Sequence, residues 1–225
     1  MATFLEICQK VRREAGVSGN GPPAVTGQSG VYEKIIQWVN DAWVEIQNAH
    51  TSWHWMWQEF SFDTVAGVGS YTLTSLNMGE MSRLRLDSLS LYLKATGPVG
   101  EGSLPYVNHR VWRRQFGSGL SVVGKPALLS LTPDRLIKIN PIPDDIYTVR
   151  GVYYRRAQRM ATNDDVPGLP VEFHDAIVQL ALLLYAANEE APEMYAAADM
   201  RLRIIMRNLE RHQLDTPELE GGSIA

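Results

Sequence analysis

The sequence predicts an α+β protein, mainly an α-helical bundle built from both ends of the chain with a β-rich insertion in the middle. Apolar residues recur at helical spacing in 3–50 and 170–212, whereas residues 58–158 alternate with the period of strands. Helices so far apart in sequence can share a core only if the middle closes back on itself. The expected parts are a discontinuous bundle of 1–57 and 168–213, an insertion of 58–167, and a C-terminal tail of 214–225.

Length, charge and cysteine content limit the function classes. The 225 residues are 45% hydrophobic, which is enough for a real core, and the net charge is −4. An acidic chain argues against a protein whose main task is neutralising phosphates, although a local basic patch remains open. The single cysteine, Cys8, cannot form an internal disulfide and fits a reducing compartment. The N-terminus lacks signal-peptide features, and the longest apolar stretch is too short for a membrane span, so we expect a cytosolic protein or a particle component.

Two helices are expected before residue 51. Thr3 and Glu6 have the spacing of a capping box, and Gly16 is a natural stop. Residues 16–30 hold five glycines and two prolines, which predicts a long loop that is either flexible or ordered by a partner. The two helices carry apolar stripes of Phe4, Cys8, Val11 and Ala15, and of Ile35, Val39, Ala42, Ile46 and Ala49.

The middle segment reads as strands with one helix. Residues 60–62 and 71–73, separated by a glycine turn, suggest a hairpin. The stretch 83–93 alternates with a phase slip at Asp87-Ser88, which predicts a bulge or bend. Asn108 can cap a short helix that ends at residue 116. Further strands are expected at 127–131, 136–139 and 147–155, with a turn at 132–135.

The C-terminal region predicts two more helices. From Pro170 to Asn188 the chain is apolar nearly all round, as in a helix buried on most sides, and Leu184→Asp is therefore expected to unfold the subunit. Pro192 begins another helix, and Arg203, Arg207 and Arg211 line a second face of it at steps of four. Its expected buried stripe is Tyr195, Ala198, Leu202, Ile205 and Leu209.

The sequence contains no recognisable catalytic, nucleotide-binding or cofactor motif, so we expect a non-enzyme without a cofactor. His50 and His54 could share a helix face, but no acidic residue or cysteine completes a zinc site, and we interpret them as a solvated or packed pair. Cys8 is expected to be a buried, inert thiol. Asp144-Asp145 and 163–165 are interpreted as turns, because they lack the ligand spacing of a calcium loop.

Two residue sets are candidates for contacts with other subunits. Five of the six tryptophans fall between residues 38 and 57, where they predict a core hinge between helix and sheet. In a second interpretation, Trp53, Trp55 and Trp57 also anchor a neighbouring subunit. Arg203, Arg207 and Arg211 could form a solvated face, a salt-bridging face toward an acidic protein or, third, a DNA contact. Three other arginines beside Trp112 allow the same three readings, namely Arg110, Arg113 and Arg114.

Several long stretches resemble the head-to-tail adaptor (connector) proteins of tailed bacteriophages. They are TFLEICQKVRREAGVSGNGP, VTGQSG, IIQWVNDAWVEIQNAH, PIPDDIYTVRGVYYRRAQRM and the late helix pair LPVEFHDAIVQLALLLYAANEEAPEMYAAADMRLRIIMRNLER. The resemblance covers about Thr3 to Arg211, and its best parts are the glycine-rich loop and the late helix pair.

The resemblance implies a homo-oligomeric ring, typically of twelve copies, in the neck of a virion assembled in the host cytoplasm. Such a ring sits below the portal protein, extends the DNA channel and presents a surface to a tail, nozzle or tail-tube protein. Viral DNA would pass through it without specific binding, and no membrane is involved. By position alone, the tail from Leu214 to Ala225 would dock on the portal, with Leu214, Leu219 and Ile224 as its apolar contacts.

The rival hypothesis is a nucleic-acid-binding packaging accessory protein that acts through Arg110, Arg113, Arg114 and the Arg203 stripe. An adaptor should join purified portal rings and show little affinity for free duplex DNA at physiological salt. The rival should bind DNA with a steep salt dependence. A tail-associated hydrolase is a distant third hypothesis.

Overall fold

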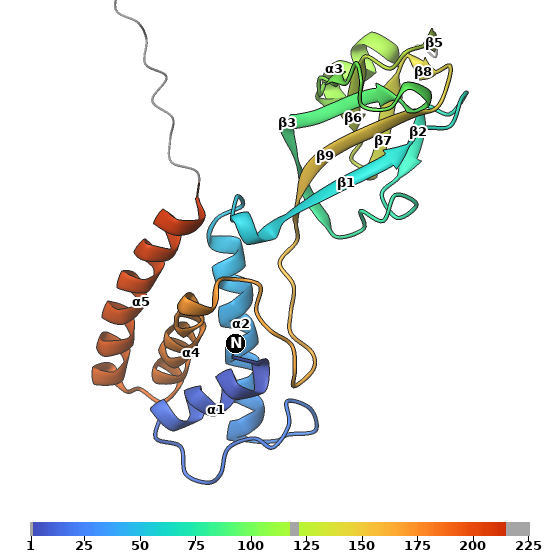
Figure 1. Cartoon of the computed structure of the whole chain (residues 1–225). Helices are drawn as coiled ribbons and strands as arrows, with labels where there is room; N and C mark the ends of the chain where they lie inside the picture. The colour runs from blue at the N-terminus through green and yellow to red at the C-terminus, as the bar shows by residue number, and fades with distance from the viewer. Residues whose placement is uncertain (1, 118–121, 215–225) are drawn as a thin grey trace, which may run out of the picture. The chain divides into compact units, whose positions relative to one another are not determined.

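The computed structural model describes residues 2–117 and 122–214, which form two compact units (Figure 1). The first unit contains residues 2–56 and 157–214 of the described chain, and the second contains residues 57–156 with its gap at 118–121. The helices of the first unit are α1 (Phe4–Glu14), α2 (Val31–Ala49), α4 (Asp175–Asn188) and α5 (Pro192–Gln213), with short 3-10 turns η1 (His54–Met56) and η3 (Val171–Phe173).

The fold class predicted from the sequence, a mainly α-helical bundle with a β-rich insertion, is wrong. The described chain is mixed, with 40% helix and 23% strand, and it contains five α-helices and several antiparallel sheets. The second unit has a hydrophobic core of its own and a helix of its own. Periodicity located strands in the middle of the chain, but it could not reveal that they enclose a separate hydrophobic core.

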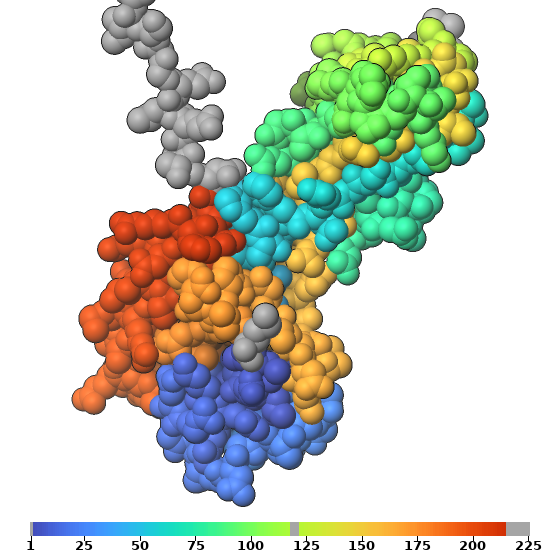
Figure 2. Space-filling model, viewed as in Figure 1, coloured from blue at the N-terminus to red at the C-terminus, as the bar shows by residue number. Residues whose placement is uncertain are grey.

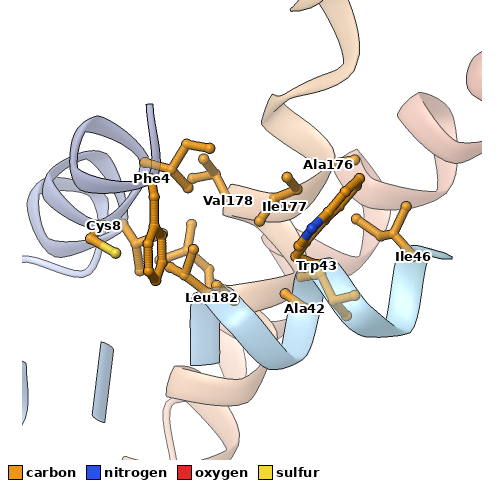
Figure 3. Packing of buried hydrophobic residues seen from close by; sticks show 14 of the residues in the cluster. Phe4, Cys8, Ala42, Trp43, Ile46, Ala176, Ile177, Val178 and Leu182 are labelled. Atoms are coloured by element: carbon orange, nitrogen blue, oxygen red, sulfur yellow. The ribbon is translucent and has the colours of Figure 1, made fainter. Parts of the chain in front are cut away.

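Helix α4 is the centre of the first unit, because it packs against α1, α2 and α5. Figure 3 shows Phe4 and Cys8 of α1 and Trp43 and Ile46 of α2 around α4 residues that include Ile177. A helix with neighbours on three sides must be apolar nearly all round, which explains its composition. Within the described residues, no helix is both long and apolar enough to cross a membrane.

The first helix begins as its sequence predicts. Thr3 and Glu6 form the reciprocal capping box, with Thr3 N donating to the Glu6 carboxylate at 2.9 Å. The following loop, 16–30, does not need a partner, because the same unit holds it in place. Val25 is buried, and its N–H donates to Asn163 Oδ1 at 2.8 Å.

Residues 157–167 run along α2 as an extended segment fixed by two side-chain amides. Asn40 bonds both the N–H and the C=O of Met160, at 2.8 and 3.0 Å. Gln47 clamps Gln158 in the same way, at 3.0 and 2.9 Å. Each amide satisfies two backbone groups that would otherwise be buried without partners.

The turn at 163–165 follows and receives the start of α1, since Phe4 N donates to Asp165 O at 2.7 Å. The hydroxyl of Thr162 and nearby backbone N–H groups bind the Asp165 carboxylate and lower its pKa. The turn interpretation of this acidic stretch is therefore confirmed.

The burial predicted for the two late helices needs two corrections. Leu184 is only half-buried, whereas Ile177 and Ala181 on the inner face of α4 are fully buried. Tyr195, placed in the buried stripe of α5, is 47% exposed. Both residues lie at the edges of apolar stripes, where sequence spacing does not decide which neighbour covers a side chain.

A pH effect follows from His174, which is buried between η3 and α4. Burial lowers the pKa of this imidazole, and its Nε2 lies 3.2 Å from Leu169 O. The unfolded chain takes up a proton at an ordinary pKa of about 6.5, but the folded ring resists it, so stability falls as the pH drops below that value. Above that pH the group has no effect.

We expect the free energy of unfolding, measured by denaturant titration, to be lower at about pH 5.5 than at pH 7.5. In His174→Gln, which cannot titrate, this decrease should be smaller. An identical decrease in both proteins would contradict the assignment to His174.

The second unit is built from two antiparallel sheets and a short parallel pair. The four-stranded sheet has the order β1-β9-β3-β4, and the three-stranded sheet has the order β2-β7-β6. The bounds are β1 (Trp57–Asp63), β2 (Ser70–Thr72), β3 (Met81–Leu93), β4 (Gly102–Ser103), β5 (Val123–Gly124), β6 (Leu128–Leu131), β7 (Leu136–Asn140), β8 (Ile142–Pro143) and β9 (Tyr147–Arg155), with η2 (Lys94–Thr96) after β3. Strands β5 and β8 pair in parallel.

The hairpin predicted between 60–62 and 71–73 is wrong. Strand β1 pairs with β9, with Phe60 opposite Gly151, and β2 pairs with β7. A Cβ at Gly151 would lie 2.8 Å from the Phe60 ring and from Leu89, so a larger residue there would have to displace these side chains. Long-range pairing of this kind leaves no local signal in either strand.

The bulge predicted at Asp87-Ser88 is confirmed, because the β3–β9 register shifts between Arg85 and Ser90. The Ser88 hydroxyl donates to Arg85 O at 2.7 Å and accepts from Val152 N at 2.8 Å. It therefore satisfies two backbone groups that the broken ladder would leave unpaired.

Helix α3 (His109–Phe116) begins as predicted, with Asn108 Oδ1 accepting from Arg110 N at 2.9 Å. The helix contacts β6. Trp112 is its buried residue, and its ring centroid lies 5.0 Å from that of Phe116.

Candidate assembly interface

Helix α5 packs against α4 through one face and leaves the opposite face open to solvent (Figure 2, orange to red). The inner face buries Ala198 and Leu209, with Leu202 and Ile205 partly covered by the first-unit core. Pro192 occupies the first turn of the helix, where its missing N–H has no consequence. The rigid inner packing fixes the direction in which the outer residues point.

The outer face of α5 carries a pair of exposed apolar side chains. Met200 is 67% exposed and Ile204 is 56% exposed, and their i, i+4 spacing places them side by side. Arg207 and Arg211 continue the same face toward the end of the helix, and Arg203 flanks it; all three are exposed. We call Met200, Ile204, Arg203, Arg207 and Arg211 the α5 outer face.

The cations at the edges of this face have acidic neighbours on their own subunit. Arg203 Nε lies 2.9 Å from Asp199 Oδ2, and this hydrogen bond raises the pKa of Arg203. Arg201 Nε lies 3.6 Å from Asp175 Oδ2. Exposed pairs of this kind stabilise the fold little, but they orient the guanidinium groups.

The tryptophans have different surroundings. Trp53 is fully buried in the first unit, donates from Nε1 to Ile46 O at 2.9 Å, and stacks on Trp55 with ring centroids 4.4 Å apart. A partner therefore cannot reach Trp53 without opening the core. Trp55 is half-buried against the same core.

Trp57 belongs to the second unit, where it begins β1. It is half-buried, with Tyr154 at its edge and the Arg85 guanidinium 4.2 Å from the ring centroid. Such a cation–π contact already occupies one side of the indole. Of the three candidate tryptophans, Trp55 and Trp57 are the ones with exposed surface.

The C-terminal candidates lie mostly beyond the described chain. Leu214 is half-buried, follows α5 as its C-cap residue and packs against the first-unit core. Leu219 and Ile224, together with the rest of the proposed docking tail, lie outside the described residues.

The residues considered as a nucleophile or as metal ligands include Cys8 and His50, and both pack within the first unit. Cys8 is buried, and burial raises the pKa of its thiol to about 12, which keeps it protonated and inert. His50 Nε2 lies 3.0 Å from Glu210 Oε1, and its ring packs edge-on against Trp53. Among the residues that the structure describes, no group of three or more potential ligands could hold a metal ion.

Met200 and Ile204 were missed by the sequence analysis. Their signal was present, because they fall outside the apolar stripe of their helix and interrupt a face that is otherwise charged. An exposed apolar pair within a charged face favours a contact surface over a solvated one.

The sequence was compared with protein-family models and with curated proteins. A family model described as SU10 adaptor protein matches residues 2–218, which is nearly the whole chain. A search of curated proteins found no match.

Proposed function

The chain belongs to the SU10 adaptor protein family, a family of phage adaptors, and we propose on this premise that it is a head-to-tail adaptor subunit. In the proposed assembly the copies form a ring beneath the portal in the virion neck, with twelve copies as the resemblance implies. The ring extends the DNA channel and gives the tail or nozzle protein its attachment surface. This role is structural, and it assigns no catalytic residue or cofactor.

The observation that supports ring formation best is the α5 outer face. A closed ring requires two different patches on each subunit, one for each neighbour. Met200 and Ile204 supply an apolar centre, and Arg203, Arg207 and Arg211 supply a basic rim, the usual anatomy of a protein interface.

The partner surface that we propose for this face is the outer row of α2 on the next copy. Helix α4 contacts both α2 and α5, so the two helices flank it within one unit (Figure 1). The exposed charged residues of α2 are Glu33, Asp41 and Glu45 against one cation, Lys34, and Asp41 also pairs with Arg159 of its own subunit at 2.7 Å. Acidic α2 therefore complements basic α5, and the arrangement repeats head to tail around a ring.

The C-terminal tail is proposed to dock on the portal. Because Leu214 packs against the core of its own subunit, a clean truncation begins at Asp215. A chain ending at Leu214 should keep its thermal midpoint and still form rings, but should no longer co-sediment with purified portal. Portal binding by the truncated chain at wild-type affinity would refute the docking role.

A further inference from the structure

Helix α3 lies in a basic stretch of the second unit. Residues 102–133 contain Arg110, Arg113, Arg114 and Lys125 and no acidic residue, a net +4 within a chain of net −4, so the remainder totals −8. A run of cations with no carboxylate between them raises the local positive potential around α3.

The three arginines project from one exposed side of α3. Arg110 precedes Arg113 and Arg114 by one helical turn, a rise of about 5.4 Å, and all three are exposed while Trp112 is buried beneath the helix. They line a cavity of about 550 Å³ together with Asn108, His109 and Pro133. We call Arg110, Arg113 and Arg114 the α3 basic face.

The arginines of the α3 basic face differ from the cations at the edges of the α5 outer face in their ion pairing. Arg203 and Arg201 of α5 pair with Asp199 and Asp175. Within the described part of the chain, none of the recorded ion pairs includes a residue of the α3 basic face. These guanidinium groups are therefore available to an external anion.

We propose that the α3 basic face binds the phosphate backbone of duplex DNA without reading its sequence. Arginine matches phosphate in a bidentate geometry, and adjacent cations suit a repeating chain of phosphates. Trp112 is only 7% exposed, so it cannot stack on bases as aromatic residues do in single-strand binders. The proposal rests on the adaptor function, which supplies the passing DNA. Three phosphate contacts on a free subunit should bind duplex DNA only weakly at physiological salt, as expected of an adaptor.

The test is fluorescence anisotropy of the full chain with short labelled duplexes of two unrelated sequences. Both should bind equally. With three phosphate contacts, the apparent Kd should rise roughly 40-fold between about 50 and 200 mM salt. Arg110→Gln/Arg113→Gln/Arg114→Gln should lose nearly all binding while keeping its circular dichroism melt.

The matched control removes three exposed cations from the first unit, Arg13→Gln/Arg159→Gln/Arg201→Gln, and should retain the wild-type salt dependence. An equal loss of DNA binding in both triple variants would show that binding depends on net charge alone, which would overturn the proposal. Absence of wild-type binding at low salt would also overturn it, as would binding of polyglutamate in place of DNA. The anisotropy assay needs no portal, so a chain that does not bind DNA leaves the ring proposal unaffected. Conversely, a chain that binds DNA but does not assemble with portal contradicts only the adaptor role.

Discussion

Met200→Glu/Ile204→Glu is expected to abolish ring assembly while leaving the subunit folded. Both side chains point away from the core, so glutamate is well solvated in the free subunit. In the proposed ring they are covered by the next copy, and burial of each is worth about 1–2 kcal/mol beyond its present partial burial. Glutamate at both positions instead removes the apolar contact and brings two carboxylates against the acidic outer row of α2, where like charges repel.

Sedimentation velocity of the purified chain with and without portal measures this effect. The control is Val65→Glu/Val99→Glu, which alters two exposed apolar residues of the second unit by the same chemistry. The control should assemble like wild type. Normal rings from the α5 double variant would remove this face from the interface.

Ile177→Asp is expected to unfold the helical unit. Ile177 has no exposed surface and lies at the centre of the core, between α4 and its neighbours (Figure 3). The substitution loses about 2–5 kcal/mol of packing and buries a carboxylate, which together approach the whole stability of an ordinary domain.

The same substitution at an exposed position provides the comparison. Ile204→Asp on the α5 outer face should melt within a few degrees of wild type, and Leu184→Asp, at a half-buried site, should fall between the two. Circular dichroism melts measure all three. A cooperative melt of Ile177→Asp near the wild-type midpoint would contradict the burial of α4.

Local features of the fold were predictable because their causes are local. The capping box of Thr3 and Glu6, the Asn108 cap and the bulge before Ser90 each depend on residues within a few positions of one another. The bounds of α2 and β9 follow from unbroken periodicity.

Features set by distant residues were not predictable. The support of the 16–30 loop could not be predicted, because Asn163, which binds Val25, lies far along the chain. The predicted partner of β1 was wrong for the same reason, since β1 pairs with the distant β9. The prediction of the fold class was wrong for the same reason, because strand periodicity alone does not reveal a second hydrophobic core.

For the candidate interfaces too, sequence spacing predicted which residues share a helix face but not which residues are buried. The spacing of Arg203, Arg207 and Arg211 placed them on one exposed helix face, which the structure contains. Spacing could not show that Trp53 is enclosed while Trp55 keeps some exposed surface, because both belong to one aromatic run. Burial depends on which distant element covers a residue.

The most direct test of the proposed function is electron cryomicroscopy of the purified chain bound to its portal. We expect a closed ring of copies beneath the portal, with Met200 and Ile204 of each subunit covered by α2 of the next. A portal without such a ring, or a ring in which the α5 outer face remains open to solvent, would contradict this account.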